Sequence, residues 1–302
     1  MIKVEDIAYV RFGAPDLDEM ERFLTDFGLV VAGRGDDVLY ARGTDPEPYV
    51  HVTERGEAGF RAVGFAAASA EDLTTAAQLP GASAVEKIDA PGGGQKVCFS
   101  DPDGFTVEVV HGRSLLEPLP VRCASPLNFG EHAPRRGTLQ RIPGGPSSVK
   151  RIGHCVLRVS DFRRSAEWYQ SRFGFLVSDD IYLGEKENIV TSFFRCDRGE
   201  EYVDHHTFLC VGLGGPGFDH AAFEVSDWDA VMAGHDHLQK AGYQHHAGIG
   251  RHLLGSQVFD YWRDPWGHVV EHFTDGDLLN VRHETGLYDP GGALACQWGK
   301  FA

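Results

Sequence analysis

Apolar and polar positions follow a plan that repeats along the chain. Residues 7–12 and 152–157 are apolar-rich segments of strand length. Each is followed by an acidic helix start and then by an amphipathic stretch that ends at a glycine, Gly28 in one case and Gly174 in the other. Apolar residues at every third or fourth position predict a helix, and glycine suits the left-handed position that ends one. Both segments therefore predict a strand followed by a helix.

The plan occurs a second time in each half of the chain. Further helices are predicted over residues 70–79 and 226–242, each after another strand-like segment. Each half then closes with an Asp-Pro-x-Gly sequence, at 101–104 and at 264–267. Proline second and glycine fourth favour a type I turn, here between segments rich in β-branched and aromatic residues. Four modules of strand, helix and further strands (βαβββ) predict an α+β fold.

A stretch without periodicity separates the two halves. Residues 113–149 are rich in proline, glycine and serine, which is typical of an interdomain linker. The length of 302 residues suits two domains. We expect an N-terminal domain of residues 1–112 and a C-terminal domain of residues 150–273. Residues 274–302 are predicted to be a C-terminal tail that packs on the surface.

Charge narrows the classes of partner. Lysine and arginine number 28 against 44 aspartate and glutamate residues, a formal charge of −16. Such an acidic chain repels phosphate, which argues against nucleic acids and anionic membranes as partners. No run of 18 apolar residues is present, so no membrane span is predicted. An N-terminus without an export signal and six scattered cysteines indicate a cytoplasmic protein with reduced thiols.

Histidines are concentrated in the second half, where 12 of the 15 lie after residue 150. Aligning the two halves sets both candidate histidines against other residues, His154 against Tyr9 and His220 against about Val63, whereas Glu271 corresponds to Glu108. Core positions should hold similar residues in both copies, whereas a site that exists once should differ. The comparison therefore indicates chemistry that is confined to the second half.

His154, His220 and Glu271 are candidate ligands of one metal ion. Each lies on a predicted strand, and rigid strands hold ligands well. Two imidazoles and one carboxylate leave open coordination positions, an arrangement suited to non-haem Fe(II). A single strand histidine is more often a core residue with a backbone partner. The occurrence of all three at matching module positions favours the metal site.

Three further residues could face the same cavity: His206, His252 and Tyr261. A neutral histidine can take or give a proton, and a tyrosine hydroxyl can donate to a developing oxyanion. The alternative for Tyr261 is a core tyrosine with a satisfied hydroxyl. His205 competes with His206, because adjacent strand residues point to opposite faces and only one can face the metal.

The remaining residues near the site are interpreted as surface or wall. His235 and His237 lie on a predicted helix and are expected on its solvated face. His245 and His246 are expected on a surface loop, with an entrance to the site as the alternative. The aromatic residues near the site permit an alkyl- or aryl-substituted ring in the pocket: Phe193, Phe194, Trp262 and Trp266.

The end of the second half carries a specific motif. Gly250-Arg251-His252, Tyr261 after eight intervening residues, Asp264-Pro265-Trp266-Gly267 and Glu271 fall in one register. This motif resembles the signature of the type I extradiol ring-cleaving dioxygenases of the vicinal oxygen chelate superfamily, and the resemblance extends over essentially the whole chain. One position departs from it: Asp260 stands where the family more often has an apolar residue.

The resemblance implies both fold and chemistry. Each pair of modules would form an open barrel, the N-terminal one without metal and the C-terminal one catalytic. Fe(II), occasionally Mn(II), would bind His154, His220 and Glu271. His206 would interact with bound dioxygen, and His252 and Tyr261 would hydrogen-bond the substrate oxygens. The substrate would be a catechol of aromatic hydrocarbon catabolism, opened to a hydroxymuconic semialdehyde-type product with both atoms of O2, by a homo-oligomer.

Two other functions fit the same fold. One is a different metalloenzyme, such as a glyoxalase-like isomerase, an epimerase or an α-keto-acid dioxygenase. The other is a binding protein without catalysis. Neither needs a counterpart of His206, His252 and Tyr261, so this set favours the extradiol dioxygenase.

Overall fold

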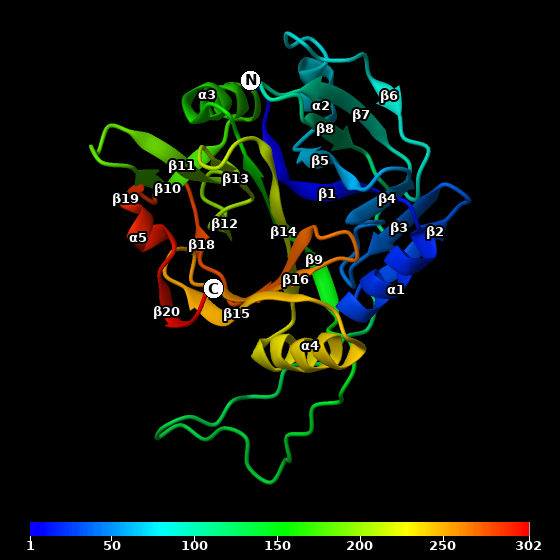
Figure 1. Ribbon diagram of the computed structural model, residues 1–302, viewed down its shortest axis with the longest axis vertical. Coiled ribbons are helices and arrows are strands. Elements are labelled where there is room, and N and C mark those ends of the chain that lie inside the picture. The colour runs from blue at the N-terminus through cyan, green and yellow to red at the C-terminus, as the bar shows by residue number, and fades with distance from the viewer. Residues whose placement is uncertain (302) are drawn as a thin grey trace.

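The computed structural model describes residues 1–301, which form two large curled sheets (Figure 1). The eight-stranded sheet has the order β2-β3-β4-β1-β5-β8-β7-β6. Its strands are β1 (Val4–Ala14), β2 (Val30–Arg34), β3 (Val38–Arg42), β4 (His51–Arg55), β5 (Gly59–Ala67), β6 (Glu86–Lys87), β7 (Gln95–Ser100) and β8 (Thr106–His111). Helices α1 (Leu17–Phe27) and α2 (Ala70–Ala76) complete this half.

The second sheet has ten strands in the order β19-β10-β11-β13-β9-β14-β17-β16-β15-β20. They are β9 (Val149–Arg158), β10 (Leu176–Tyr182), β11 (Ile189–Arg195), β13 (Phe208–Val211), β14 (Gly217–Val225), β15 (His245–His252), β16 (Val258–Arg263), β17 (Val269–Thr274), β19 (Gly286–Tyr288) and β20 (Cys296–Gly299). Its helices are α3 (Phe162–Phe173), α4 (Trp228–Ala241) and α5 (Pro290–Ala293). A small separate sheet joins β12 (Val203–Asp204) to β18 (Leu278–Leu279).

The predicted plan of four βαβββ modules and the α+β class are confirmed. In each half the first strands of the two modules pair antiparallel, β1 with β5 and β9 with β14. Each first strand also pairs in parallel with the last strand of a module, for example β14 with β17. The centre of each sheet is therefore assembled from both modules.

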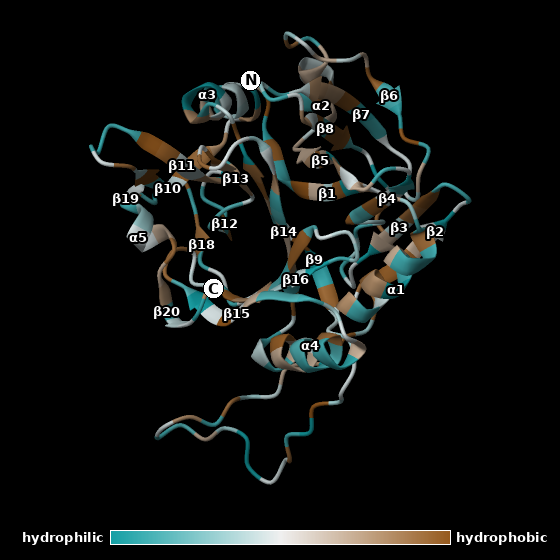
Figure 2. Cartoon of the chain, viewed as in Figure 1, coloured by the Kyte–Doolittle hydropathy of each residue, from teal (hydrophilic) through white to brown (hydrophobic). Residues whose placement is uncertain are grey.

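The helices begin and end where the polar pattern indicated. The side chain of Asp161 accepts a hydrogen bond from the backbone N–H of Arg164 and caps α3. Gly174 ends α3 with a φ of 68°, and Gly28 ends α1 with a φ of 106°. Figure 2 shows hydrophobic colour concentrated on strands such as β11, whereas α4 alternates between teal and brown. One face of α4 therefore packs on the sheet and the other meets solvent.

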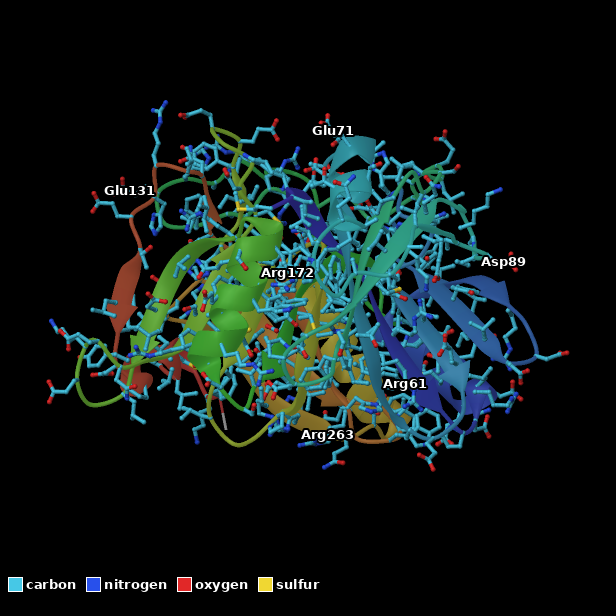
Figure 3. All side chains as sticks on the ribbon, turned by 90° about the horizontal axis from the view of Figure 1, so that it is seen from above. Arg61, Glu71, Asp89, Glu131, Arg172 and Arg263 are labelled. Atoms are coloured by element: carbon cyan, nitrogen blue, oxygen red, sulfur yellow. The ribbon has the colours of Figure 1, made fainter. Side chains whose placement is uncertain are left out.

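Charged side chains decorate the outside. In Figure 3 the labelled acidic residues Glu71, Asp89 and Glu131 lie at the outer edge of the molecule. Within residues 1–301, no helix has both the length and the apolar character needed to cross a membrane.

Residues 113–148 run past α4 as an irregular loop (Figure 1). Arg122 pairs with Asp227, which also caps α4, and Gln140 donates to Asp229 in the first turn of that helix. The segment is thus tied to α4 by its side chains. The division of the chain into domains at the bounds given above stays a prediction.

The sequence predicts a C-terminal tail that packs on the surface, but the segment also adds two strands to the ten-stranded sheet. Its strands β19 and β20 pair with β10 and β15, which would otherwise be the edge strands of the ten-stranded sheet. An unpaired edge strand exposes backbone hydrogen-bonding groups, so these short strands cover both edges. The glycine and proline residues between them obscured the strands in the sequence.

His51 makes stability depend on pH. It is buried where β4 meets the second sheet, its ring 5.1 Å from the ring of Phe12 and 6.4 Å from that of Phe223. Burial lowers the pKa of His51 to about 3, a change that nearby His268 assists and nearby Asp264 opposes. In the unfolded chain this histidine therefore takes up a proton as the pH falls through about 6.5, whereas in the folded chain it stays neutral down to about pH 3.

We expect this one residue to remove about 1.4 kcal/mol of unfolding free energy per pH unit as the pH falls below about 6.5. Urea unfolding of the wild type and His51→Phe over this range measures the contribution, because the variant should show the shallower slope. Equal slopes would contradict a neutral buried His51.

Candidate active site

Three central strands of the ten-stranded sheet bring the predicted ligands together. Ala222 on β14 lies opposite His154 on β9 and opposite Glu271 on β17. His220 is two residues before Ala222 and so shares its face of the sheet. The register alone therefore places both imidazoles and the carboxylate on one face.

The donor atoms converge closely enough to share one ion. His154 Nε2 lies 3.3 Å from His220 Nε2 and 3.3 Å from Glu271 Oε2, and His220 Nε2 lies 3.6 Å from the same Oε2. Both oxygens of Glu271 are buried without a hydrogen-bond partner among residues 1–301. Burial raises the pKa of Glu271, and a buried carboxylate without donors is costly. A cation at this point would supply the missing partner, so the residues present fit a metal.

Asp219 orients one of the candidate ligands, and the sequence reasoning missed it. Its Oδ1 lies 2.8 Å from His220 Nδ1, the ring nitrogen that points away from Glu271. Such a carboxylate fixes the tautomer and ring orientation of a metal-binding histidine. The signal was present in the sequence as an acidic residue directly before the histidine.

The three further candidates surround the same place. The ring of His206 lies 4.1 Å from the ring of His154. His252 Nε2 lies 3.0 Å from the Tyr261 hydroxyl and 3.9 Å from Glu271 Oε1. All six predicted residues are thus within one cluster.

Burial sets the protonation states of these groups. It lowers the pKa of His206 well below the usual value and that of His252 to about 4, so both imidazoles are neutral near pH 7. Burial, together with the nearby charge of Glu271, raises the pKa of Tyr261 well above 10. Tyr261 therefore keeps its proton and can donate it in a hydrogen bond, whereas the histidines can accept a proton.

A cavity of about 260 Å³ opens on the cluster. Five of the six residues line it, and Glu271 lies beneath them, fully buried. Its other walls are mostly apolar and include Val156, Ile181, Phe193, Leu209, Val211, Leu213 and Leu254. The C-terminal segment adds Pro290, Ala293, Leu294 and Phe301. The cavity can hold an aromatic ring against the cluster.

Two expectations about the aromatic walls need correction. Of the four aromatic residues named from the sequence, Phe193 lines the cavity, while Phe194 and Trp262 are fully buried in the core and Trp266 packs against it. Phe301, which the sequence reasoning missed, lies 5.5 Å from the Tyr261 ring. The sequence gives no sign of this, because the segment reaches the cavity only through the pairing of β20 with β15.

The His205-His206 pair is not on a strand, contrary to the expectation. Both residues lie in the bend between β12 and β13, so the alternation of faces does not apply. His206 faces the cavity, and His205 stands behind it with the two Nδ1 atoms 3.1 Å apart. His205 Nε2 in turn lies 2.8 Å from Asp179 Oδ2 on β10. The three buried side chains form a chain that leads to the cavity.

The series of contacts from Asp179 through His205 to His206 predicts a positioning role for Asp179. Asp179→Asn removes the negative charge behind His205, so His206 should be held less well for proton transfer. We expect kcat to fall by about tenfold or more with the metal content unchanged, and the pH profile of kcat to shift. Asp180→Asn is the matched control, because Asp180 accepts from Ser192 instead. An unchanged kcat and pH profile in Asp179→Asn would refute the role.

In the first half, arginine and lysine side chains surround Glu108, the residue that corresponds to Glu271. Gly64 lies opposite both Tyr9 and Glu108, as Ala222 lies opposite His154 and Glu271. The Tyr9 hydroxyl, Arg11 Nη2 and Lys96 Nζ each lie 2.7 Å from an oxygen of Glu108. Two side-chain cations therefore neutralise this carboxylate in place of a metal.

The register also corrects the repeat alignment. The residue two before Gly64 is Ala62, so Ala62 rather than Val63 occupies the position of His220. Val63 is one residue removed and faces the opposite side of the sheet. The conclusion that this half lacks the second histidine is unchanged.

Tyr9→His should therefore not create a second metal site. Ala62 still supplies no ligand, and Arg11 and Lys96 still hold Glu108. We expect metal content per chain, measured by plasma mass spectrometry, to equal that of the wild type. A doubled metal content would overturn the comparison of the two halves.

Four other histidines differ from expectation. His235 and His237 are half-buried on α4 and contact Asp260 and Asp26, respectively, rather than standing in solvent. His245 and His246 lie on β15 and not on a loop. Asp260 precedes Tyr261 on β16 and points to the opposite face, so it forms no part of the cavity wall.

Comparison with known proteins identifies the family. The model of the Glyoxalase/Bleomycin resistance protein/Dioxygenase superfamily matches residues 151–272. Metapyrocatechase 2 of Cupriavidus necator is 30% identical, over 98% of this chain and 89% of that protein. This chain belongs to the type I extradiol dioxygenase family of the vicinal oxygen chelate superfamily. The resemblance drawn from the sequence motif is thereby confirmed.

Two more proteins are similar to this chain. The iron-dependent extradiol dioxygenase of Rhodococcus jostii (strain RHA1) is 24% identical over 91% of this chain and 90% of that protein. The crystal structure of the Mn(II)-bound glyoxalase from Novosphingobium aromaticivorans superposes with a TM-score of 0.81 and 23% identity, covering 100% of this chain and 93% of that one. The last likeness shows the fold alone. The roles of the six site residues of this extradiol dioxygenase family member stay predictions.

Proposed function

We propose that this protein is an Fe(II)-dependent extradiol dioxygenase that opens a catechol-type ring beside its vicinal diol with O2. The observation that carries the proposal is the convergence of a buried two-histidine, one-carboxylate cluster with His206, His252 and Tyr261 at one cavity. A glyoxalase-like isomerase or a binding protein would need the fold but not these three further residues. Donors of this kind suit Fe(II), with Mn(II) as the alternative.

His154, His220 and Glu271 would hold the metal. Bound there, iron would supply a template for the diol and dioxygen and a path for electron density between them. The chain's own part is to fix the three donors on strands and to keep water away from them by burial.

The cavity residues would manage the protons. Tyr261 keeps its proton and would donate a hydrogen bond to a substrate oxygen, with His252 beside it as an acceptor. His206, neutral and on the His154 side of the cavity, would take up a proton as the diol binds and return it as the ring opens. Both atoms of O2 would end in a hydroxymuconic semialdehyde-type product.

The walls of the cavity favour an uncharged substrate. Among residues 1–301 no lysine or arginine lines it, and Asp219 is the acidic residue on its surface. A carboxylate substituent would be buried without a partner and near a negative charge, which is costly. We therefore propose catechol or an alkylcatechol rather than a carboxylated catechol.

We also propose that the protein works in the cytoplasm, and its six cysteines support this. All of them are free thiols, as expected of a protein in reducing cytoplasm. The proposal also includes the homo-oligomeric state implied by the family resemblance.

Anaerobic reconstitution with Fe(II), followed by oxygen uptake over a catechol panel, tests the function. We expect uptake of O2 and a yellow ring-fission product with catechol and 3-methylcatechol. The value of kcat/KM for 3,4-dihydroxyphenylacetate should be lower by about tenfold or more. Its carboxylate would be buried without a partner, which costs at least about 1.4 kcal/mol, and this free energy corresponds to a factor of ten. Turnover of a hemithioacetal without oxygen uptake would instead support an isomerase.

A further inference from the structure

A second group of two imidazoles and one carboxylate lies on the other face of β16. Tyr261 points into the catalytic cavity, while the preceding residue, Asp260, points under α4. His235 reaches Asp260 from α4, and His245 reaches it from β15. The three residues come from separate elements: β15 and β16 are neighbouring strands of the sheet, and α4 lies beside them (Figure 1).

The contacts within this group are short. His245 Nε2 lies 2.9 Å from Asp260 Oδ1, and His235 Nδ1 lies 3.1 Å from both carboxylate oxygens. One donor atom from each of the three residues lies within 4.8 Å of the other two, as in the catalytic cluster. The side-chain geometry therefore meets at one point.

Asp260 is an unusual residue for its place. Its carboxylate side chain is 0% exposed. Removing a carboxylate from water is costly unless charge and hydrogen bonds compensate for it. Trp262 Nε1 donates to Oδ2 at 2.6 Å, which fixes the carboxylate and leaves Oδ1 turned toward the two histidines. An indole that orients a carboxylate in this way resembles the outer support of a metal ligand.

The histidines are open to solvent where Asp260 is not. Their side chains are 19% exposed for His235 and 33% for His245, so an ion can reach the group from outside. His237, on the same helix, shows the simpler alternative: it pairs with Asp26 and has no second imidazole at hand. At Asp260, by contrast, two imidazoles and a carboxylate bring three possible ligand atoms together.

We propose that His235 Nδ1, His245 Nε2 and Asp260 Oδ1 bind Zn²⁺ or a similar divalent metal ion. Two imidazole nitrogens and one carboxylate oxygen suit Zn²⁺, with water as a fourth ligand. Each of these ring nitrogens must present a lone pair, so its proton moves to the other ring nitrogen or is released to solvent. This site lies outside the proposed catalytic function and does not depend on it.

The bound ion would act as a structural link. It would tie α4 to β15, which carries His252, and to β16, which carries Tyr261. Both strands lie at the side of the cavity where the substrate oxygens would be held. Zinc should therefore stabilise the fold and hold these strands against α4.

The experiment uses the iron-loaded protein, equilibrated with ZnCl2 and freed of excess metal by gel filtration. Iron and zinc are measured together by plasma mass spectrometry. We expect about one zinc per chain in addition to the resident iron, and less than about a tenth of that zinc in His235→Ala and in His245→Ala, with iron retained in both. His237→Ala, two residues along the same helix, is the matched control and should keep its zinc.

Several outcomes would overturn the proposal. Equal zinc in His235→Ala, His245→Ala and the wild type would show adventitious binding. Zinc uptake matched by an equal loss of iron would show binding at the catalytic cluster instead. Co²⁺ added in place of zinc gives an independent readout, because visible absorption typical of tetrahedral Co²⁺ should appear in the wild type and in His237→Ala but not in His235→Ala.

Discussion

Glu271→Ala and His154→Ala should each lose the metal and with it the activity. Either change removes one of only three protein donors, and Glu271 supplies the one negative charge among them. A bound metal contributes several kcal/mol to transition-state stabilisation, so turnover should fall by about a thousandfold or more. Iron content by plasma mass spectrometry and oxygen uptake with catechol measure the two effects separately.

The loss of metal should not come from unfolding. Both oxygens of Glu271 lack a hydrogen-bond partner in the described chain, so alanine removes an uncompensated buried charge. The metal-free Glu271→Ala protein should therefore be at least as stable toward urea as the metal-free wild type. Glu108→Ala is the matched control in the other half: it should keep the iron but lose stability, because it removes the partner of Lys96 and one of the two carboxylates that pair with Arg11. Full iron content in Glu271→Ala would refute the ligand assignment.

His206→Ala should separate catalysis from binding. The residue faces the cavity and contacts the ring of His154, but it belongs to no cluster of donor atoms that could share the ion. We expect the variant to retain iron and to bind catechol anaerobically, yet to turn over about 10²–10⁴-fold more slowly, the usual contribution of a general acid–base group. Optical titration with catechol under argon measures binding, and oxygen uptake measures turnover.

His246→Ala serves as the control for this variant. His246 lies on β15 with its Nδ1 3.2 Å from Arg263 Nη2, and it does not line the cavity. It should turn over at the wild-type rate. A wild-type rate in His206→Ala would show that another residue does the proton transfer.

The sequence predicted those parts of the molecule that depend on local pattern. Helix α3 with its Asp161 cap and Gly174 end follows from side-chain periodicity and backbone preference, which act within a few residues. The two-histidine, one-carboxylate set followed from comparing the two halves, because a duplicated fold should repeat its core but not a site that exists once.

The parts that could not be predicted depend on contacts between distant segments. Asp179 is 26 residues from His205 along the chain, and nothing local links them. The bend that carries His205 and His206 was taken for a strand, because its apolar neighbours resemble one. The C-terminal strands were missed because only the open edges of β10 and β15 give those short segments a reason to pair.

The same limit explains the one-residue error in the repeat alignment. Irregular pairing occurs close to His220 in β14 and close to Ala62 in β5, and it shifts the register there. A shift of one residue reverses the face on which a side chain lies, and the sequence does not mark where such shifts occur.

The most direct test of the account is anomalous diffraction at the iron absorption edge from crystals loaded with Fe(II) under argon. The account predicts a peak within bonding distance of His154 Nε2, His220 Nε2 and a carboxylate oxygen of Glu271, at the base of the cavity that His206, His252 and Tyr261 line. Iron bound elsewhere, or bound without one of the three donors, would contradict it.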